Sequence, residues 1–161
     1  MNVSASSDEK GDLAERVVGE LENYQRLSIE VLTRHEADPE AGLKALVALH
    51  LSWTEKDPER ARMVSRHRNE VAAGPLGERL ANSNQIWFGQ MKVWIDSQVE
   101  TGRMVPVSFN LLHAVVFAPT QEIAKLWLAG RLKRSLSSYA DGLAEAAWAS
   151  VKALPVRLQA P

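Results

Sequence analysis

The chain has 161 residues, 45% hydrophobic and 24% charged, which is the balance of a single globular domain large enough to bury a core. It contains no cysteine, which excludes disulfides and thiolate metal sites. A net charge of −1 excludes a general electrostatic attraction to nucleic acid or to anionic membranes.

The first residues are small and polar, and we predict that residues 1–8 are disordered and that the domain begins at residue 9. From Leu13 to Val31, apolar residues recur at helical spacing with acidic residues between them. This pattern predicts a long amphipathic helix that ends near residues 35–38. No apolar segment follows Met1, so no signal peptide is expected and the cytoplasm is the predicted location.

The sequence Asp-Pro-Glu occurs at residues 38–40 and again at residues 57–59. In each case the aspartate is suited to cap a helix, the proline to occupy its first position and the glutamate to favour its first turn. The first of these two helices carries His50 and Trp53 on one face, and the second ends at the Gly-Pro pair at 74–75.

Two further helices are predicted, from about Leu76 to Thr101 and from about Ser108 to Gly130. Residues 111–118 of the later helix are apolar at every position except His113. That run is far shorter than the roughly 20 residues of a membrane span, so no membrane is expected as a partner. A helix that is apolar nearly all round needs cover on both sides. A second copy of the chain is the simplest cover, and the alternative is a central position in a monomeric bundle.

A last helix is predicted from about Tyr139 to Val151, with Pro155 ending it and residues 155–161 forming a tail. Ala140, Ala144 and Ala147 lie at helical spacing and would form a flat seam for a second helix, although alanine also simply favours helix formation. No strand alternation is present, and the chain is therefore predicted to be all-α, with six helices.

The order of these segments resembles the C-terminal ligand-binding and dimerisation domain of TetR-family transcriptional regulators. The resemblance covers residues 9–154, and it is carried by GDLAERVVGELENYQ, DPEAGLKALVALHLSW, DPERARMVSRHR, ERLANSNQIWFGQMKVWIDSQVETGRM, LLHAVVFAPTQEIAKLWLAGR and YADGLAEAAWASVKAL. It implies a six-helix orthogonal bundle in which middle helices enclose a small-molecule pocket and the last two helices form a homodimer interface.

Members of that family begin with a helical head that contains a helix-turn-helix. Here the segment EKGDLAERV resembles the region just after the recognition helix, and only a few residues precede it. The resemblance therefore implies that DNA would be bound only through a head domain that this chain lacks. We expect the chain alone not to bind duplex DNA specifically.

A mostly apolar pocket with a few polar groups to orient its ligand is predicted between the middle helices. Each of the ligand-binding residues named below could equally be part of an ordinary core, with the histidines hydrogen-bonded inside it. The predicted ligand-binding residues are His50, Trp53, Asn84, Trp87, Phe88, Met91, Asn110 and His113. The residues predicted to form the homodimer interface are Phe109, Val116, Thr120, Ile123, Trp127, Ala140, Leu143, Ala144, Ala147, Trp148 and Val151.

The four histidines show no spacing that is typical of a metal site, and no nucleophile or phosphate-loop motif is present, so no cofactor, metal or catalytic residue is predicted. The favoured function is an effector-sensing domain of a TetR-like regulator that binds a small hydrophobic molecule. The alternative is a dimerising interaction protein without a ligand, which could pair with a full-length relative. A helical enzyme with an unrecognised site is the third, less favoured hypothesis. A cavity between the helices distinguishes the first hypothesis from the second.

Overall fold

A computed structural model describes residues 6–154, and all regular secondary structure in that range is helical, as predicted. The long helices are α1 (Ser7–Thr33), α2 (Pro39–Lys56), α3 (Pro58–Ala72) and α4 (Gly77–Glu100). They are followed by α5 (Phe109–Leu112), a π-helical turn η1 (His113–Phe117), α6 (Ala118–Leu128), a 3-10 turn η2 (Leu136–Tyr139) and α7 (Ala140–Ala153). Since α5, η1 and α6 run on without a break, as do η2 and α7, six helical segments result. The predicted tail at residues 155–161 and the first five residues lie outside the described range.

Most helix ends follow from short-range signals in the sequence. Asp38 and Asp57 each accept a hydrogen bond of 3.0 Å from a backbone N–H in the first turn of their helices. Gly102 and Gly130 both have positive φ, 71° and 74°, and end their helices in the left-handed conformation that glycine adopts most easily. The first helix begins at Ser7, earlier than predicted, because Ser6 and Glu9 form a capping box.

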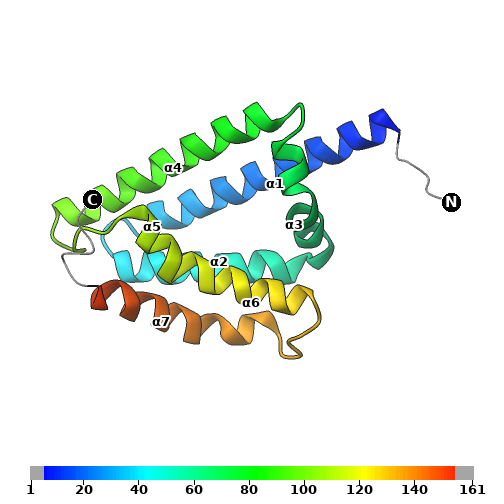
Figure 1. The fold of residues 1–161 in the computed structure, drawn as a ribbon. Coiled ribbons are helices and arrows are strands. Elements are labelled where there is room, and N and C mark those ends of the chain that lie inside the picture. Colours follow the sequence, from blue (N-terminus) through cyan, green and yellow to red (C-terminus); the bar gives the residue numbers. More distant parts are fainter. Residues whose placement is uncertain (1–5, 155–161) are drawn as a thin grey trace.

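The helix α2 lies at the centre of the fold and packs against α1, α3, α6 and α7 (Figure 1). Its residues Leu43, Leu46, Val47 and Leu51 are at most 2% exposed. They join buried residues from α1, α4, η1 and α7 in the larger of two apolar clusters. The central helix of the fold is therefore α2, and not the helix from Phe109 to Leu128.

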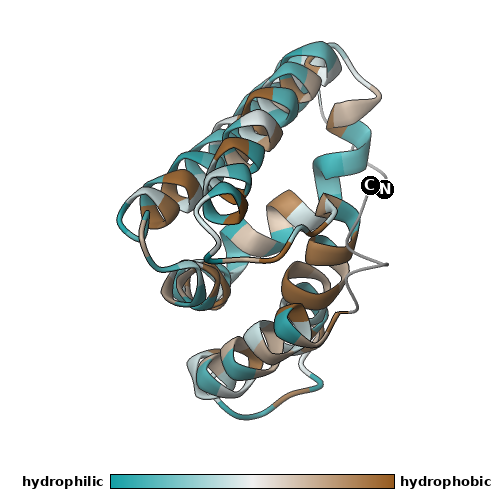
Figure 2. Ribbon diagram, turned by 90° about the vertical axis from the view of Figure 1, so that its left-hand side faces the viewer, coloured by the Kyte–Doolittle hydropathy of each residue, from teal (hydrophilic) through white to brown (hydrophobic). Residues whose placement is uncertain are grey.

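A smaller apolar cluster joins the first half of α1 to α3 and to the beginning of α4. It contains Val17, Val18, Val64 and Leu80, and Trp53 from the end of α2 also belongs to it. Seen nearly end-on, hydrophobic and hydrophilic residues alternate along the outer helices, which is the pattern of amphipathic helices buried on one side (Figure 2). Leu128 of α6 also packs against this smaller cluster, and Arg62 of α3 donates hydrogen bonds to its backbone carbonyl.

The π turn in the helix from Phe109 to Leu128 has a local cause in Pro119. Proline has no N–H group, and its ring collides with the carbonyl group four residues earlier, here that of Val115. The backbone widens in response, and the N–H of Ala118 bonds to the carbonyl of His113, five residues earlier. The apolar pattern of residues 108–130 predicted an uninterrupted helix, and the π turn is a departure from that prediction.

The junction between α3 and α4 depends on a glycine with no space for a side chain. A Cβ atom on Gly77 would lie 2.2 Å from the carbonyl oxygen of Ala72, a backbone atom that cannot move away alone. We expect Gly77→Ala to lower the free energy of unfolding by about 2 kcal/mol, measured by urea denaturation. The matched control is Gly89→Ala in the middle of α4, where the added Cβ has no heavy atom within 4 Å. That variant should gain roughly 0.5–1 kcal/mol from helix propensity. Equal effects of the two variants would contradict this assignment.

Candidate functional site

A cavity of about 310 Å³ lies between α1, α2, α3 and α6. Its volume is within the range of pockets that hold small organic ligands. Aromatic, apolar and polar side chains line it together. The lining residues are Leu21, Tyr24, His50, Trp53, Thr54, Ala61, Val64, Ser65, Arg68, Asn69, Gln121, Ala124, Lys125 and Leu128.

A tyrosine and a histidine are paired at one wall of this cavity. The Oη atom of Tyr24 lies 3.0 Å from Nδ1 of His50, and the two rings meet edge to face at 5.6 Å between centroids. Burial raises the pKa of Tyr24 and lowers the pKa of His50 to about 4, so both groups are neutral at pH 7. The phenol hydroxyl has no other acceptor among the described residues. The direction of this bond follows the tautomer of His50, since the neutral imidazole carries its proton on one of its two nitrogens.

Trp53 forms the adjoining part of the wall and is held on two sides. The Tyr24 ring meets it at 5.3 Å between centroids and 71° between planes, and the guanidinium carbon of Arg60 lies 4.4 Å from its ring centroid. Arg60 also donates a 2.8 Å hydrogen bond to the backbone carbonyl of Trp53. The indole N–H is buried and has no hydrogen-bond partner within residues 6–154. A buried donor without a partner is uncommon in a folded chain.

Only His50 and Trp53, of the eight residues predicted to bind a ligand, line this cavity. Asn84 accepts a 2.8 Å hydrogen bond from the side chain of Gln25, and the indole of Trp87 donates a 2.8 Å bond to Ser28. These bonds fasten α4 to α1, so the two polar groups have a structural role and are not free for a ligand.

The other four predicted ligand-binding residues lie elsewhere in the fold. Met91 is fully buried in the larger apolar cluster, and Asn110 is exposed on α5. Phe88 packs against Phe109 at 4.6 Å between ring centroids, and His113 lies 5.9 Å from Phe117. The prediction that these residues share one pocket with His50 is wrong, because the rings of α4 contact Phe109 of α5, which in turn contacts the rings of η1.

A wider groove, about 600 Å³ in volume, runs between α1 and α4 and is open to solvent. Its charged residues already have partners. Arg79 forms hydrogen bonds of 2.8–2.9 Å with Glu15 and Glu22, and Arg26 pairs with Glu30. The groove therefore offers a ligand few unpaired polar groups, and the cavity at Tyr24 and His50 is the better candidate site.

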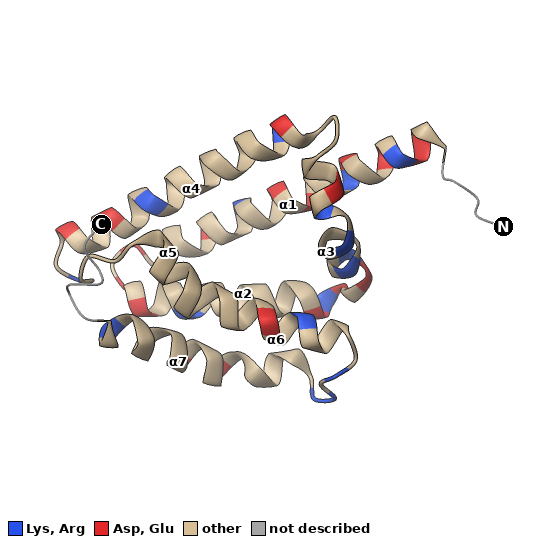
Figure 3. Cartoon of the chain, viewed as in Figure 1, with Lys and Arg blue, Asp and Glu red and all other residues tan. Residues whose placement is uncertain are grey.

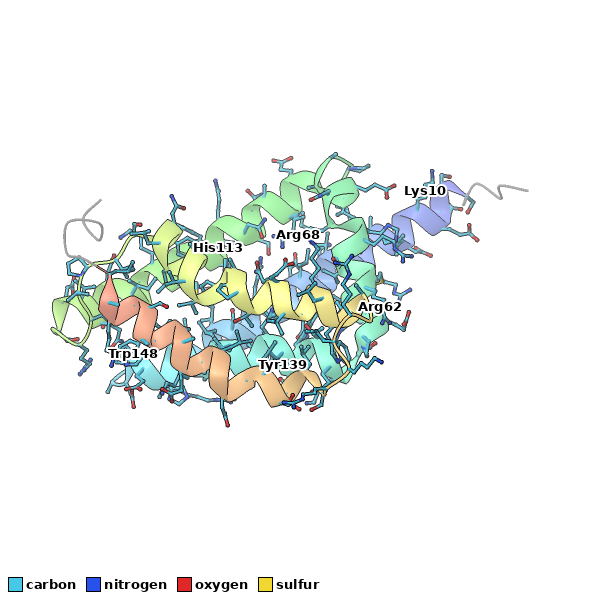
Figure 4. All side chains as sticks on the ribbon, turned by 60° about the horizontal axis from the view of Figure 1, so that its bottom comes forward. Lys10, Arg62, Arg68, His113, Tyr139 and Trp148 are labelled. Atoms are coloured by element: carbon cyan, nitrogen blue, oxygen red, sulfur yellow. The ribbon has the colours of Figure 1, made fainter. Side chains whose placement is uncertain are left out.

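Several lining residues were not predicted from the sequence, Tyr24, Arg68, Gln121 and Lys125 among them. Tyr24 lies on the apolar stripe of the first predicted helix, where a hydroxyl group was a usable signal. The other three lie on faces of α3 and α6 that resemble any solvated helix surface. In the projection of Figure 4, Arg68 of α3 is seen between the ribbons of α4 and α6.

The predicted dimer interface is contradicted at five of its residues. Val116, Thr120, Ala144, Ala147 and Val151 are between 1% and 7% exposed and are buried within one copy of the chain. The alanine face of α7 packs against α2 instead of forming an open seam. The other predicted interface residues are partly exposed, namely Phe109, Ile123, Trp127, Ala140, Leu143 and Trp148.

Within residues 6–154, no group of three or more His, Asp or Glu side chains is placed to hold a metal ion. None of the helices in the same range has both the length and the apolar character needed to cross a bilayer. No protein-family model matches the chain, and no curated protein is significantly similar to it in sequence. The site must therefore be interpreted from its own geometry.

Because His50 is neutral in the folded chain, its titration should make folding sensitive to acid. Its pKa is about 4 when folded and near 6.5 when unfolded, so the unfolded chain binds the proton first as pH falls below 6.5. Stability should be complete above pH 6.5 and should fall by about 2 kcal/mol on reaching pH 4.5. His50→Gln should remove that part of the pH dependence in urea unfolding, whereas His113→Gln, at an exposed histidine, should keep it. Parallel pH profiles for the wild-type chain and His50→Gln would contradict the assignment.

Proposed function

We propose that the chain is an effector-binding and dimerisation domain of a TetR-like transcriptional regulator, and that the cavity between α1, α2, α3 and α6 holds a small aromatic molecule. The observation that carries the ligand-binding part is the cavity itself. It combines a 310 Å³ volume with the paired Tyr24 and His50 in its lining.

The order and number of the helical segments agree with the resemblance on which the regulator proposal rests. Dimerisation is supported by the surface of α6 and α7, where Ile123, Trp127, Leu143 and Trp148 remain partly exposed. Figure 3 shows few charged residues on α5 and α7, compared with α3 (Figure 3). Apolar surface of low charge is typical of the centre of a homodimer interface.

A thermal-shift screen with aromatic compounds tests the ligand-binding part. A compound present at about 100 times its dissociation constant should stabilise the fold by roughly 2.7 kcal/mol, which corresponds to several degrees in Tm. Ser65→Trp should abolish the shift by obstructing the cavity that Ser65 lines. Arg66→Trp is the control, because Arg66 is exposed on the same helix and lies outside the lining. A screen without any stabilising compound would favour the interaction protein instead.

A further inference from the structure

The charged residues at the cavity are all of one sign. Arg68 from α3 and Lys125 from α6 line it, and no aspartate or glutamate does so. Neither cation forms an ion pair or a side-chain hydrogen bond with any residue that the structure describes. Most other arginines of the first three helices differ in this respect, since Arg26, Arg60 and Arg62 all have carboxylate partners.

The two cations are also exposed, and they come from two different helices that line the cavity, α3 and α6. The deeper wall contains the buried apolar residues Leu21, Val64 and Ala124. A ligand that complements this arrangement has an apolar part in contact with the buried wall and a negatively charged group near the two exposed cations. A cationic ligand would meet two positive charges with no carboxylate to balance them.

The volume limits the size of the apolar body. A cavity of about 150 Å³ is large enough to hold benzene, so 310 Å³ corresponds to roughly two fused rings or a ring with a short acid side chain.

We infer that the ligand of this cavity is an aromatic organic acid of one or two rings, whose anionic group is bound between Arg68 and Lys125 while its ring contacts the apolar wall. This inference rests on the proposed function, because it names the ligand class of the same cavity. Arginine and lysine both bind carboxylates through charge-assisted hydrogen bonds, and arginine can do so with two bonds at once.

The test compares two probes of one shape, 2-naphthoate and its uncharged amide, 2-naphthamide, by isothermal titration calorimetry on the whole chain. We expect the acid to bind about tenfold more tightly than the amide at pH 7. Raising sodium chloride from about 50 mM to about 500 mM should reduce that preference, because exposed charges are screened by salt. Arg68→Gln combined with Lys125→Gln should abolish the preference and leave the affinity for the amide unchanged.

The matched control removes two cations outside the cavity, Arg66→Gln together with Lys133→Gln, both of which are exposed. This variant carries the same net charge as the Arg68 and Lys125 variant and should retain the preference for the acid. Equal affinities for acid and amide in the wild-type chain would overturn the inference and leave a ligand-binding cavity in place. If neither probe binds, both the inference and the ligand-binding function are wrong.

Discussion

Replacing Ala144 with glutamate is expected to unfold the chain, and not merely to separate two folded copies of it. Ala144 is 7% exposed on the side of α7 that packs against α2, next to buried residues of the larger apolar cluster. A carboxylate there is both too large for the space and without a cationic partner. Overpacking the core and burying an unpaired charge together cost about 3–5 kcal/mol, a large part of the free energy of unfolding of a domain of this size.

The control for this variant is Ala149→Glu, which places the same side chain on the exposed side of α7. We expect it to melt within a few degrees of the wild-type chain in circular dichroism, while Ala144→Glu should show little cooperative melting or should aggregate. Sedimentation then separates the two interpretations of the alanine face. A folded, monomeric Ala144→Glu variant would restore the open seam predicted from the sequence.

Removing the carboxylate of Glu55 is expected to destabilise the chain by about 3 kcal/mol. Its two oxygens accept hydrogen bonds from the backbone N–H groups of Leu136 and Ser137, at 2.7 and 3.0 Å. These N–H groups begin η2, where no helical carbonyl can accept them, so a residue distant in sequence supplies the cap. Hydrogen bonds to a charged group contribute roughly 1.5–3 kcal/mol each. Leu136 is fully buried, so in a variant without the Glu55 carboxylate its N–H group would lose its acceptor and could not bond to water instead.

Urea denaturation of Glu55→Ala and Glu55→Gln tests this assignment. The glutamine retains one oxygen acceptor and should lose about half as much stability as the alanine variant. Glu122→Ala is the control, because Glu122 is exposed and has no ion pair within the described range. A Glu55→Ala variant within about 0.5 kcal/mol of the wild type would show that η2 is held by packing alone.

Helix positions were largely predictable because their signals act over a few residues. Asp38 and Asp57 cap helices that begin at the next residue, and Gly102 and Gly130 follow helix ends. Each of these preferences depends on a backbone conformation or a hydrogen bond within about four positions along the chain. The sequence therefore sufficed to predict the all-helical class and the six helical segments.

The choice of which side of a helix is buried depended on packing between distant segments. The apolar run at residues 111–118 and the alanines of α7 both indicated contact surfaces, but the sequence could not decide between α2 and a second copy as the partner. Small residues permit close approach of any helix, so periodicity alone does not identify which one approaches. The structure assigns Ala144 and Ala147 to α2, and the π turn caused by Pro119 changes the direction of the side chains beyond it.

The candidate site was the least predictable part, since its residues come from four helices and share no spacing. His50 and Trp53 could be found because they are a polar and an aromatic residue on an apolar helix face. Tyr24 is 26 residues before His50, and Lys125 lies far beyond both, so only the tertiary structure brings them to one cavity. Short-range chemistry determined where the helices of this chain begin and end, whereas the packing of α1, α3 and α6 around α2 decided which side chains face a space that a ligand can occupy.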